Sequence, residues 1–470
     1  MKSRVEKDPL GEKRVPADVY YGIQTLRALE NFPISGLRAH PIFVKATVMV
    51  KRAAAEANTS LGLLDPRIGR AIIQAADEVL KGNFADQFVI DVYQAGAGTS
   101  HNMNVNEVLA NRAIEILGGA KGDYSIVHPN DHVNMAQSTN DVFPTAMRVA
   151  TLLLLEELYP TLSRLEEVLE EKGREFYRII KAGRTHLQDA APIRLGQEFR
   201  AYARAISQCR RRMRGASQEL FLLGIGGSAV GTGLNTHPEY RKRVVGNLRK
   251  LTSLKLRGAP DLFEAMQSMA PFANLSGALR VLALELIRIA NDLRLMSSGP
   301  RTGLGEIILP PVQPGSSIMP GKVNPVIAEA MNMVGFQVVG NDLTISLAAQ
   351  AGQLELNVMM PVIIHNLLQS IEILKNGIRV FADRCVAGIT ANQKRCLELA
   401  ELSVALATAL NPYIGYGAAA EIAKELVRTG RPIREVVLER GIMPKEKLDR
   451  VLSLIGMTRP RLLRKVAKWR

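Results

Sequence analysis

The stretch LSGALRVLALELIRIANDLRLM, residues 275–296, carries the clearest structural signal in this chain of 470 residues. Its apolar side chains return in alternating steps of four and three residues, which is typical of a helix packed against other helices. They are Leu275, Leu279, Leu282, Leu286, Ile289, Leu293 and Met296. Val281, Leu284, Ile287 and Leu295 are apolar as well. The sequence therefore predicts a helix that is buried on more than one face.

Helical periodicity recurs along the chain, whereas the alternation typical of strands is scarce. A second seam surrounds Pro160, which we expect to kink or break its helix. Its members are Leu158, Leu162, Leu165 and Leu169. Long helical patterns also cover roughly residues 325–350 and 358–387. The sequence thus predicts an all-α protein with a central bundle of long helices.

The chain is too long for one ordinary core, so we expect several domains. The long patterns predict a central helix-bundle domain over residues 141–393. We expect a smaller helical domain before it, over residues 1–140. After about Asn392 the chain is more polar and carries turn signals such as NPYIGYG. A small C-terminal domain is therefore predicted over residues 394–470.

The N-terminus and the cysteines indicate a cytoplasmic protein. The N-terminal MKSRVEKDPLGEK is charged and no apolar stretch follows it, so it does not resemble a secretory signal. No apolar run has the length needed to cross a bilayer, and we expect no membrane partner. The chain has three cysteines, Cys209, Cys385 and Cys396, which is an odd number and includes no CxxC pair. This pattern argues against a disulfide framework or a zinc site, and we expect no bound metal.

The formal net charge is +15, which could indicate a nucleic-acid partner or a small anion. Lysines and arginines are mostly scattered among acidic residues, and only 5% of residues are aromatic. So few aromatic side chains argue against base-stacking surfaces. We expect no nucleic-acid partner, and a positive field that attracts a small dianion.

Four polar stretches interrupt the helical pattern. They are AGAGTSHNMNVNE (95–107), HPNDHVNMAQSTND (128–141), GRTHLQDA (183–190) and PGSSIMPGKVNP (314–325). Ser, Thr, Asn, His and Gly recur in them, and the last one adds a lysine. Neutral hydrogen-bonding groups combined with a cation are suited to holding carboxylates.

The last of these stretches combines several features of an anion site. Asn324 followed by Pro325 is typical of a helix start, where negative charge is favoured. Lys322 adds a full positive charge, and Ser316 and Ser317 supply hydroxyls beside two glycines. Each residue alone fits a capped surface loop. Together they predict a binding or catalytic site.

The other stretches leave two interpretations open. His186 is one of seven histidines, four of which fall in polar stretches, so it fits a functional role as well as a structural one. The run from Ser138 to Asn140 fits an ordinary helix start with Asp141 as its cap. GIGGSAVGTG at residues 224–233 resembles a phosphate loop, but no strand precedes it and no acidic residue follows at the required spacing. We therefore discount it as a phosphate site.

GSSIMPGKVNP, residues 315–325, resembles the signature of the aspartase/fumarase superfamily. The other three polar stretches resemble that family's substrate-binding regions in the same order. The similarity runs from DPLGEKRVPADVYYGIQTLRALENFPISG near the N-terminus to REVVLERG near the end. GAGTS, GRTHLQDA, NDLRLMSSGPR and AGQLELNVM resemble the aspartase branch more than the fumarases. His101, Met333 and Met360 depart from that branch, and HPND also occurs in fumarases.

The resemblance implies elimination of ammonia from L-aspartate to give fumarate, without a cofactor. Activation by a divalent cation is left open, because some members respond to such ions. The alternative is loss of water from malate, as in fumarate hydratase. Either reaction removes a proton beside a carboxylate and must stabilise a dianionic aci-carboxylate. Ser316 would be the base, with its pKa lowered by Lys322, by loop amides and by the helix dipole.

The resemblance also assigns roles to the remaining polar residues, set by set. The β-carboxylate would be held by Ser138, Thr139 and Ser317, and the α-carboxylate by Thr185, Lys322 and Asn324. The amino group would be surrounded by Thr99, Asn140 and His186, and Glu329 would orient His186. A second anion site like that of fumarases would contain His128, Asn130 and Asp131.

The family fold is all-α with three domains. A homotetramer with a twenty-helix core is implied, in which three chains contribute to each active site. A structural protein on the same fold, like the related lens crystallins, is the non-enzymatic alternative. It predicts loss of Ser316, Lys322 or His186, and all three are present.

Overall fold

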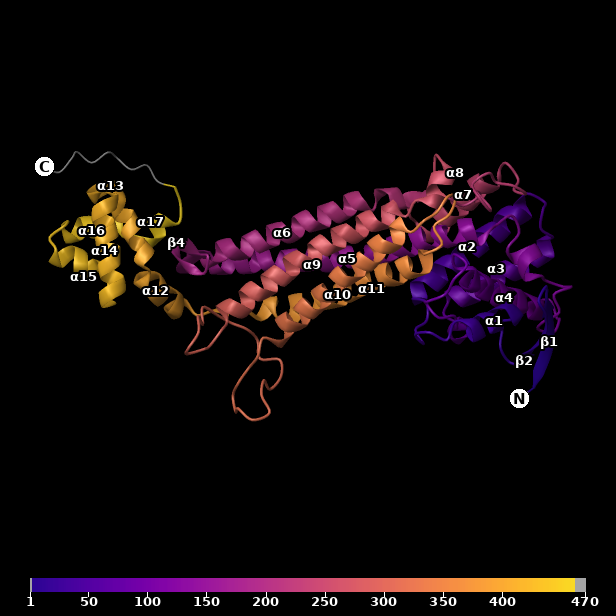
Figure 1. The fold of residues 1–470 in the computed structure, drawn as a ribbon, viewed down its shortest axis with the longest axis horizontal. Coiled ribbons are helices and arrows are strands. Elements are labelled where there is room, and N and C mark those ends of the chain that lie inside the picture. Colours follow the sequence, from indigo (N-terminus) through magenta and orange to yellow (C-terminus); the bar gives the residue numbers. More distant parts are fainter. Residues whose placement is uncertain (1, 461–470) are drawn as a thin grey trace. The chain divides into compact units, whose positions relative to one another are not determined.

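The computed structural model describes residues 2–460, which are mainly helical (Figure 1). Within them the strands pair only two at a time, in four small sheets. Three of these pairs are antiparallel, and one, β5–β6, is parallel. The predicted all-α class is therefore confirmed.

Several shorter elements precede the five longest helices in the chain. They are β1 (Ser3–Asp8), β2 (Gly11–Pro16), α1 (Ile23–Asn31), α2 (Pro41–Ser60), α3 (Pro66–Leu80), α4 (Thr99–Ile116) and a π-helical turn, η2 (Pro129–Val133). Asp65 caps α3 by accepting hydrogen bonds from the Arg67 and Ile68 amides, and Pro66 follows at the first helical position. The buried faces of α2, α3 and α4 share one apolar core.

The long helices supply most of the remaining structure. They are α5 (Thr139–Glu175), α6 (Leu195–Ala216), α9 (Ala270–Met296), α10 (Val326–Gln350) and α11 (Met360–Arg384). The prediction that Pro160 breaks its helix is wrong, because α5 continues through Pro144 and Pro160. Leu158 and Leu162, on either side of Pro160, are both fully buried.

Smaller elements connect and follow the long helices. They are β3 (Ile180–Thr185), β4 (Gln188–Arg194), β5 (Leu222–Leu223), α7 (Tyr240–Thr252), β6 (Arg257–Gly258), α8 (Leu262–Gln267), β7 (Ile307–Ile308), β8 (Thr390–Ala391), α12 (Gln393–Leu402), α13 (Asn411–Ile414), α14 (Tyr416–Thr429), α15 (Ile433–Glu439), α16 (Lys445–Val451) and α17 (Leu454–Met457). Residues between Leu406 and Leu452 form a small core of their own. The three cysteines are all buried, and none forms a disulfide within residues 2–460.

The chain forms two compact units, each described by itself. The first holds residues up to 160, 209–284 and 334–376, and the second holds 161–208, 285–333 and 377 onward. In the first unit, α9 and α10 are joined by a 2.7 Å hydrogen bond from Ser276 to Asp342. In the second, they are joined by a 2.7 Å bond from Asn332 to Asn291. Helix bundling therefore occurs in both units, and the three domain boundaries stay a prediction.

The seam of α9 is as predicted, with all seven members from Leu275 to Met296 buried. The prediction of burial on a further face is wrong for Leu284 and Leu295, which are 51% and 41% exposed in the single chain. Among the described residues only α9 is long and apolar enough to cross a membrane, and core helices of soluble proteins have the same character.

Helix α10 is apolar on two opposite faces. One face is buried and includes Met331, Val338 and Ile345. The other face carries large apolar side chains that are spaced three, seven and four residues apart. Each of these side chains is between 58% and 68% exposed. They are Met333, Phe336, Leu343 and Leu347. A helix that is apolar all round needs partners on every side, and the described chain covers only one side.

Candidate active site

The predicted residues Ser138, Thr139 and Asn140 lie at the N-terminus of α5. The Ser138 Oγ accepts a hydrogen bond from the Asn140 amide at 3.2 Å, and Asp141 Oδ1 accepts one from the Ser138 amide at 2.9 Å. Ser138 is therefore the N-cap, and Asp141 accepts from its amide as the acidic residue of a capping box does. The helix start was therefore predicted correctly, but the cap was assigned to the wrong residue. Amides at a helix N-terminus favour anions.

The glycine-rich loop, residues 224–233, packs on this helix start. Asp141 Oδ2 accepts hydrogen bonds from the amides of Gly226 and Ser228, at 3.0 and 2.9 Å. The Asn140 side chain donates to the Ala229 carbonyl at 2.9 Å. Burial raises the pKa of Asp141 to about 6, although these amides oppose the shift. The loop therefore supports the α5 N-terminus, a role that the sequence analysis did not assign to it.

A buried lysine lies in the same region. Lys51 Nζ donates to Asn134 Oδ1 at 2.7 Å and to Gln137 Oε1 at 3.1 Å. Burial lowers the pKa of Lys51 to about 7, and the carboxylate of Asp141 acts in the opposite direction. Lys51 gives no signal in the sequence, because it lies within an alanine-rich helical segment that shows no polar motif.

Thr99 begins α4 close to the α5 N-terminus. The preceding Gly98 has a φ of +92°, and a Cβ atom built on it would lie 2.2 Å from the ring of Phe143. Glycine is thus required by both backbone conformation and packing. The exposed Thr99 side chain donates to the Gly96 carbonyl at 2.7 Å. The start of α4 at Gly98 therefore packs on α5 at Phe143, three residues after Asn140.

Two of the residues that depart from the aspartase pattern are core residues. The His101 ring stacks on Phe43, its Nε2 lies 3.0 Å from the Thr47 hydroxyl, and burial lowers its pKa to about 3. Met360 is completely buried, whereas Met333 lies on the exposed face of α10. None of the three occupies the Ser138–Asn140 segment or the loop at Ser316.

The predicted second anion site forms a local cluster around η2. His128 Nδ1 accepts hydrogen bonds from the amides of Asn130 and Asp131, both at 3.2 Å, and it lies 3.4 Å from Asp131 Oδ2. Asn130 and Asp131 are exposed. The structure therefore places these three residues together, and their function stays a prediction.

In the second unit, Thr185 and His186 lie at the exposed tip of the β3–β4 hairpin. The two turn residues, His186 and Leu187, have φ values of +56° and +58°. Such turns are normally made by Asn and Gly, so a histidine and a leucine here store backbone strain. Strain of this kind clusters at functional sites, which favours the functional interpretation of His186.

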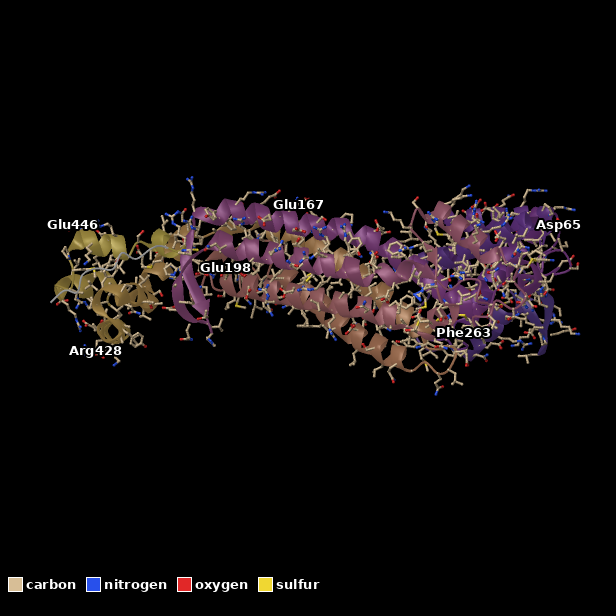
Figure 2. The ribbon with its side chains drawn as sticks, turned by 90° about the horizontal axis from the view of Figure 1, so that it is seen from above. Asp65, Glu167, Glu198, Phe263, Arg428 and Glu446 are labelled. Carbon is tan, nitrogen blue, oxygen red and sulfur yellow. The ribbon has the colours of Figure 1, made fainter. Side chains whose placement is uncertain are left out.

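A buried ionic network fixes the base of this hairpin. Glu306 is fully buried, and its carboxylate lies 2.9 Å from Arg184 and 3.2 Å from Lys181. Lys181 also forms an ion pair with Glu198 at 3.0 Å, and Glu198 is labelled in Figure 2. Because Arg184 precedes Thr185 directly, the network holds the strand that carries the predicted site residues.

The loop that carries Ser316 is closed at its base. The Gly315 amide donates to the Lys322 carbonyl at 2.9 Å, and the Asn324 side chain donates to the Gly315 carbonyl. A Cβ atom on Gly315 would lie 2.3 Å from the Lys322 carbonyl oxygen, so only glycine fits there. Asn324 therefore closes the loop just before α10 begins at Val326.

Ser316 Oγ accepts hydrogen bonds from two backbone amides of its own loop. The donors are Ile318 at 3.3 Å and Met319 at 2.9 Å. Donors of this kind favour the ionised form of the group that accepts them. Ser317 and Lys322 are exposed beside it, and no hydrogen bond or ion pair holds the Lys322 side chain among the described residues. The arrangement suits a hydroxyl that must become an oxyanion.

The structure does not join all the predicted residues. No hydrogen bond or ion pair within residues 2–460 links Glu329 to His186, or the hairpin tip to the Ser316 loop. The predicted set thus falls into three groups, carried by the α4 and α5 N-termini, by the β3–β4 hairpin and by the loop before α10. In the described part of the chain, no three His, Cys, Asp or Glu side chains gather as metal ligands would.

The fold is helical, and the three groups present hydroxyls, backbone amides and one lysine, which are the kinds of group that suit an anion site. A family model described as Lyase matches residues 11–340, and one described as Fumarase C C-terminus matches residues 406–459. The first match covers more than half of the chain. The protein therefore belongs to this lyase family, the aspartase/fumarase superfamily.

Individual relatives match over nearly the full length. An aspartate ammonia-lyase of Bacillus subtilis is 55% identical over 97% of this chain and 96% of its own. A class II fumarate hydratase of Thermosynechococcus vestitus is 49% identical over 96% and 97%. The crystal structure of a fumarate lyase:delta crystallin from Brucella melitensis bound to cobalt aligns with a TM-score of 0.95 and 49% identity, covering 98% of this chain and 100% of that one.

Proposed function

We propose that the protein is an aspartate ammonia-lyase, a carbon–nitrogen lyase that converts L-aspartate to fumarate and ammonia. The observation that carries the mechanism is the Ser316 hydroxyl, which accepts two amide hydrogen bonds on a loop at the start of α10. The substrate assignment is supported by aspartate ammonia-lyases that are 47–55% identical over nearly the whole chain.

The proposed reaction begins with the Ser316 alkoxide. It removes a proton from the substrate Cβ, and the electron pair moves into the β-carboxylate to give the aci-carboxylate dianion. The amides at the α5 N-terminus, with Ser138, Thr139 and Ser317, stabilise the extra charge where it develops. The dianion then collapses, the Cα–N bond breaks, and fumarate forms as ammonia leaves. Ser316 finally loses its proton to ammonia or to water.

The remaining groups bind and orient the substrate in this proposal. Lys322, Thr185 and Asn324 hold the α-carboxylate, and the lysine charge also favours ionisation of Ser316. Thr99, Asn140 and His186 surround the amino group, and Glu329 orients His186. Asn140 Nδ2 already donates to the Ala229 carbonyl, which leaves its Oδ1 free to accept from an ammonium group.

We propose a homotetramer in which each active site combines groups from three chains. Two observations support it. The exposed apolar face of α10 calls for a partner outside the described chain. No bond within the described chain joins the hairpin tip to the Ser316 loop, so each can complete a site on another copy. The three-domain division, cytoplasmic location and independence from cofactors complete the proposal.

A direct comparison of substrates tests the assignment. Purified enzyme is incubated with L-aspartate or with L-malate, and fumarate is followed by its ultraviolet absorbance. We expect strong preference for aspartate, with malate turned over poorly or not at all. The class II fumarate hydratase relative at 49% identity supports the alternative. Comparable turnover of malate would favour that function instead.

A further inference from the structure

A cavity in the first unit contains none of the residues assigned to the proposed reaction. It has a volume of about 490 Å³ and lies between the start of α2, the end of α3 and one face of α11. Its walls are largely apolar and include Val44, Val79, Phe88 and Ile373. Ligand pockets for small organic molecules span roughly 300–1,000 Å³, so this cavity has the size of a ligand site.

The polar groups around the cavity favour an anion. Arg38 and Lys45 line it, both are exposed, and neither forms an ion pair among the described residues. The N-terminus of the 20-residue helix α2, at Pro41, also faces it. The carboxylate Glu372 lies at the same cavity but is already paired with Lys375 at 2.8 Å. The unpaired charge of the lining is therefore positive.

The two histidines of the cavity add neutral polar groups. Burial lowers the pKa of both His40 and His365, so they are largely uncharged at neutral pH. His40 Nδ1 accepts a hydrogen bond from the Ile42 amide at 3.2 Å. The cavity thus combines an apolar body, two hydrogen-bonding rings and two cations at its edge. A dicarboxylate such as aspartate has no apolar part to fill it.

We propose that this cavity binds a small monocarboxylate with an aromatic or branched aliphatic body. The body lies against Val44, Val79 and Phe88, and the carboxylate pairs with Arg38 and Lys45. No residue assigned to the elimination reaction lines the cavity, so the site is a second one.

The cavity is connected by packing to the start of α4. His40 and His365 also line a much smaller cavity together with Phe43, His101 and Phe143. The Phe143 ring in turn packs directly on Gly98, the residue before Thr99. A ligand that displaces the two histidines therefore acts on the wall behind Thr99. We expect occupancy of the cavity to change the KM for substrate. This consequence rests on the proposed function, whereas binding of the ligand to the cavity does not.

Three probes of equal size test the site on the intact protein without substrate. They are 3-phenylpropionate, 3-phenylpropan-1-ol and 3-phenylpropylamine, and their affinities are measured by isothermal titration calorimetry. We expect the carboxylate to bind, and the alcohol and amine to bind at least about tenfold more weakly. Fumarate should not displace it. Equal binding of the three probes, or displacement by fumarate, would overturn the proposal.

Variants locate the site. Ala85 is exposed and lines the cavity, so Ala85→Trp should block binding, whereas the matched Ala85→Ser should not. The double variant Arg38→Gln/Lys45→Gln should weaken binding about tenfold. The control Arg67→Gln/Lys81→Gln, which removes two exposed cations from the ends of α3 outside the lining, should leave it unchanged.

Two results contradict the proposed binding site, and a third removes only its link to α4. Binding that survives Ala85→Trp places the ligand elsewhere. A failure of 3-phenylpropionate to bind, together with a change in oligomer mass on Ala85→Trp, shows that a second copy of the chain covers the cavity. A KM for aspartate that is unchanged at saturating 3-phenylpropionate removes the link to α4 but not the binding site. Inactivity toward aspartate with intact probe binding contradicts only the proposed function.

Discussion

The start of α5 and the loop before α10 both place serines next to the N-terminus of a long helix, yet they are held very differently. At α5, Asp141 is fully buried and joins the capping box to two amides of the 224–233 loop. At the other loop, hydrogen bonds close the base and two loop amides donate to Ser316, but no buried partner holds the tip within the described residues, and Ile318 there is 83% exposed. The first region is held by buried hydrogen bonds to a distant segment, whereas the second is largely exposed.

This difference matches the two tasks of the proposed reaction. Amides and hydroxyls that stabilise developing charge work best when they are already in place. A base that must be shielded from water can close over the substrate only after the substrate has bound. We therefore expect variants of the Ser316 loop to change activity without changing stability, and variants beneath α5 to change stability.

The largest expected effect is the loss of the base. Ser316→Ala should lower kcat by about 10³-fold or more, since general bases contribute 10²–10⁴-fold and the loop makes few packing contacts. The melting temperature should not change. Initial rates and thermal unfolding, measured in parallel, check both parts.

The neighbouring Ser317→Ala is the matched control, because it removes a hydroxyl from the same loop. It should keep more activity than Ser316→Ala. If a well-folded Ser316→Ala enzyme retained more than about a few per cent of kcat, Ser316 would not be the base.

Mixed tetramers test whether the two regions serve one site from different chains. Pure Ser138→Ala should be weak, because a carboxylate contact is lost, and pure Ser316→Ala should be inactive. When the two are denatured together and refolded, some sites receive both intact serines, and activity should rise well above either parent. Mass spectrometry confirms the mixed species.

Sites built within a single chain would behave otherwise. Each would carry one defect regardless of its neighbours, so mixing could restore nothing. Confirmed mixed tetramers without recovery would refute the shared-site proposal.

A smaller loss of activity is expected at Lys322. Lys322→Met keeps the length of the side chain and removes its charge, so the α-carboxylate binds less tightly and Ser316 ionises less readily. We expect a higher KM together with a lower kcat, and a combined loss in kcat/KM of about 10–100-fold. Steady-state kinetics measure the two constants separately. A change in melting temperature alone, with normal kinetics, would make Lys322 a structural residue.

The smallest effect is a pH-dependent change in stability from Asp141. Its folded-state pKa of about 6 lies above the ordinary value of 3.8, so its contribution is fully present below about pH 4 and is lost as the pH rises through about 6. The difference in unfolding free energy between the natural protein and Asp141→Asn should therefore fall by about 2–3 kcal/mol over that interval. Urea unfolding at fixed protein concentration measures it, and a difference independent of pH would contradict the buried, ionisable state.

Several features were predictable from local sequence alone. The seam from Leu275 to Met296 predicted a packed helix, because a 3.6-residue repeat places every third or fourth side chain on one face. Asn324 and Pro325 predicted the start of α10 to within a residue. The polar composition and order of the four stretches pointed to the family, and the comparisons with known lyases confirmed it.

The tertiary structure decided the features that depend on contacts between distant segments. The support of Asp141 by Gly226 and Ser228 spans more than 80 residues, and neither segment alone shows a need for the other. Lys51 gave no local signal, because only its burial beside Asn134 and Gln137 makes it unusual. α5 continues through Pro160, and its own Leu158 and Leu162 on either side of the proline are buried by segments that the local sequence does not reveal. A sequence fixes which faces are apolar and where helices begin, since these follow from nearest neighbours along the chain. Which buried charge meets which amide is decided only when packing brings those segments within hydrogen-bonding distance.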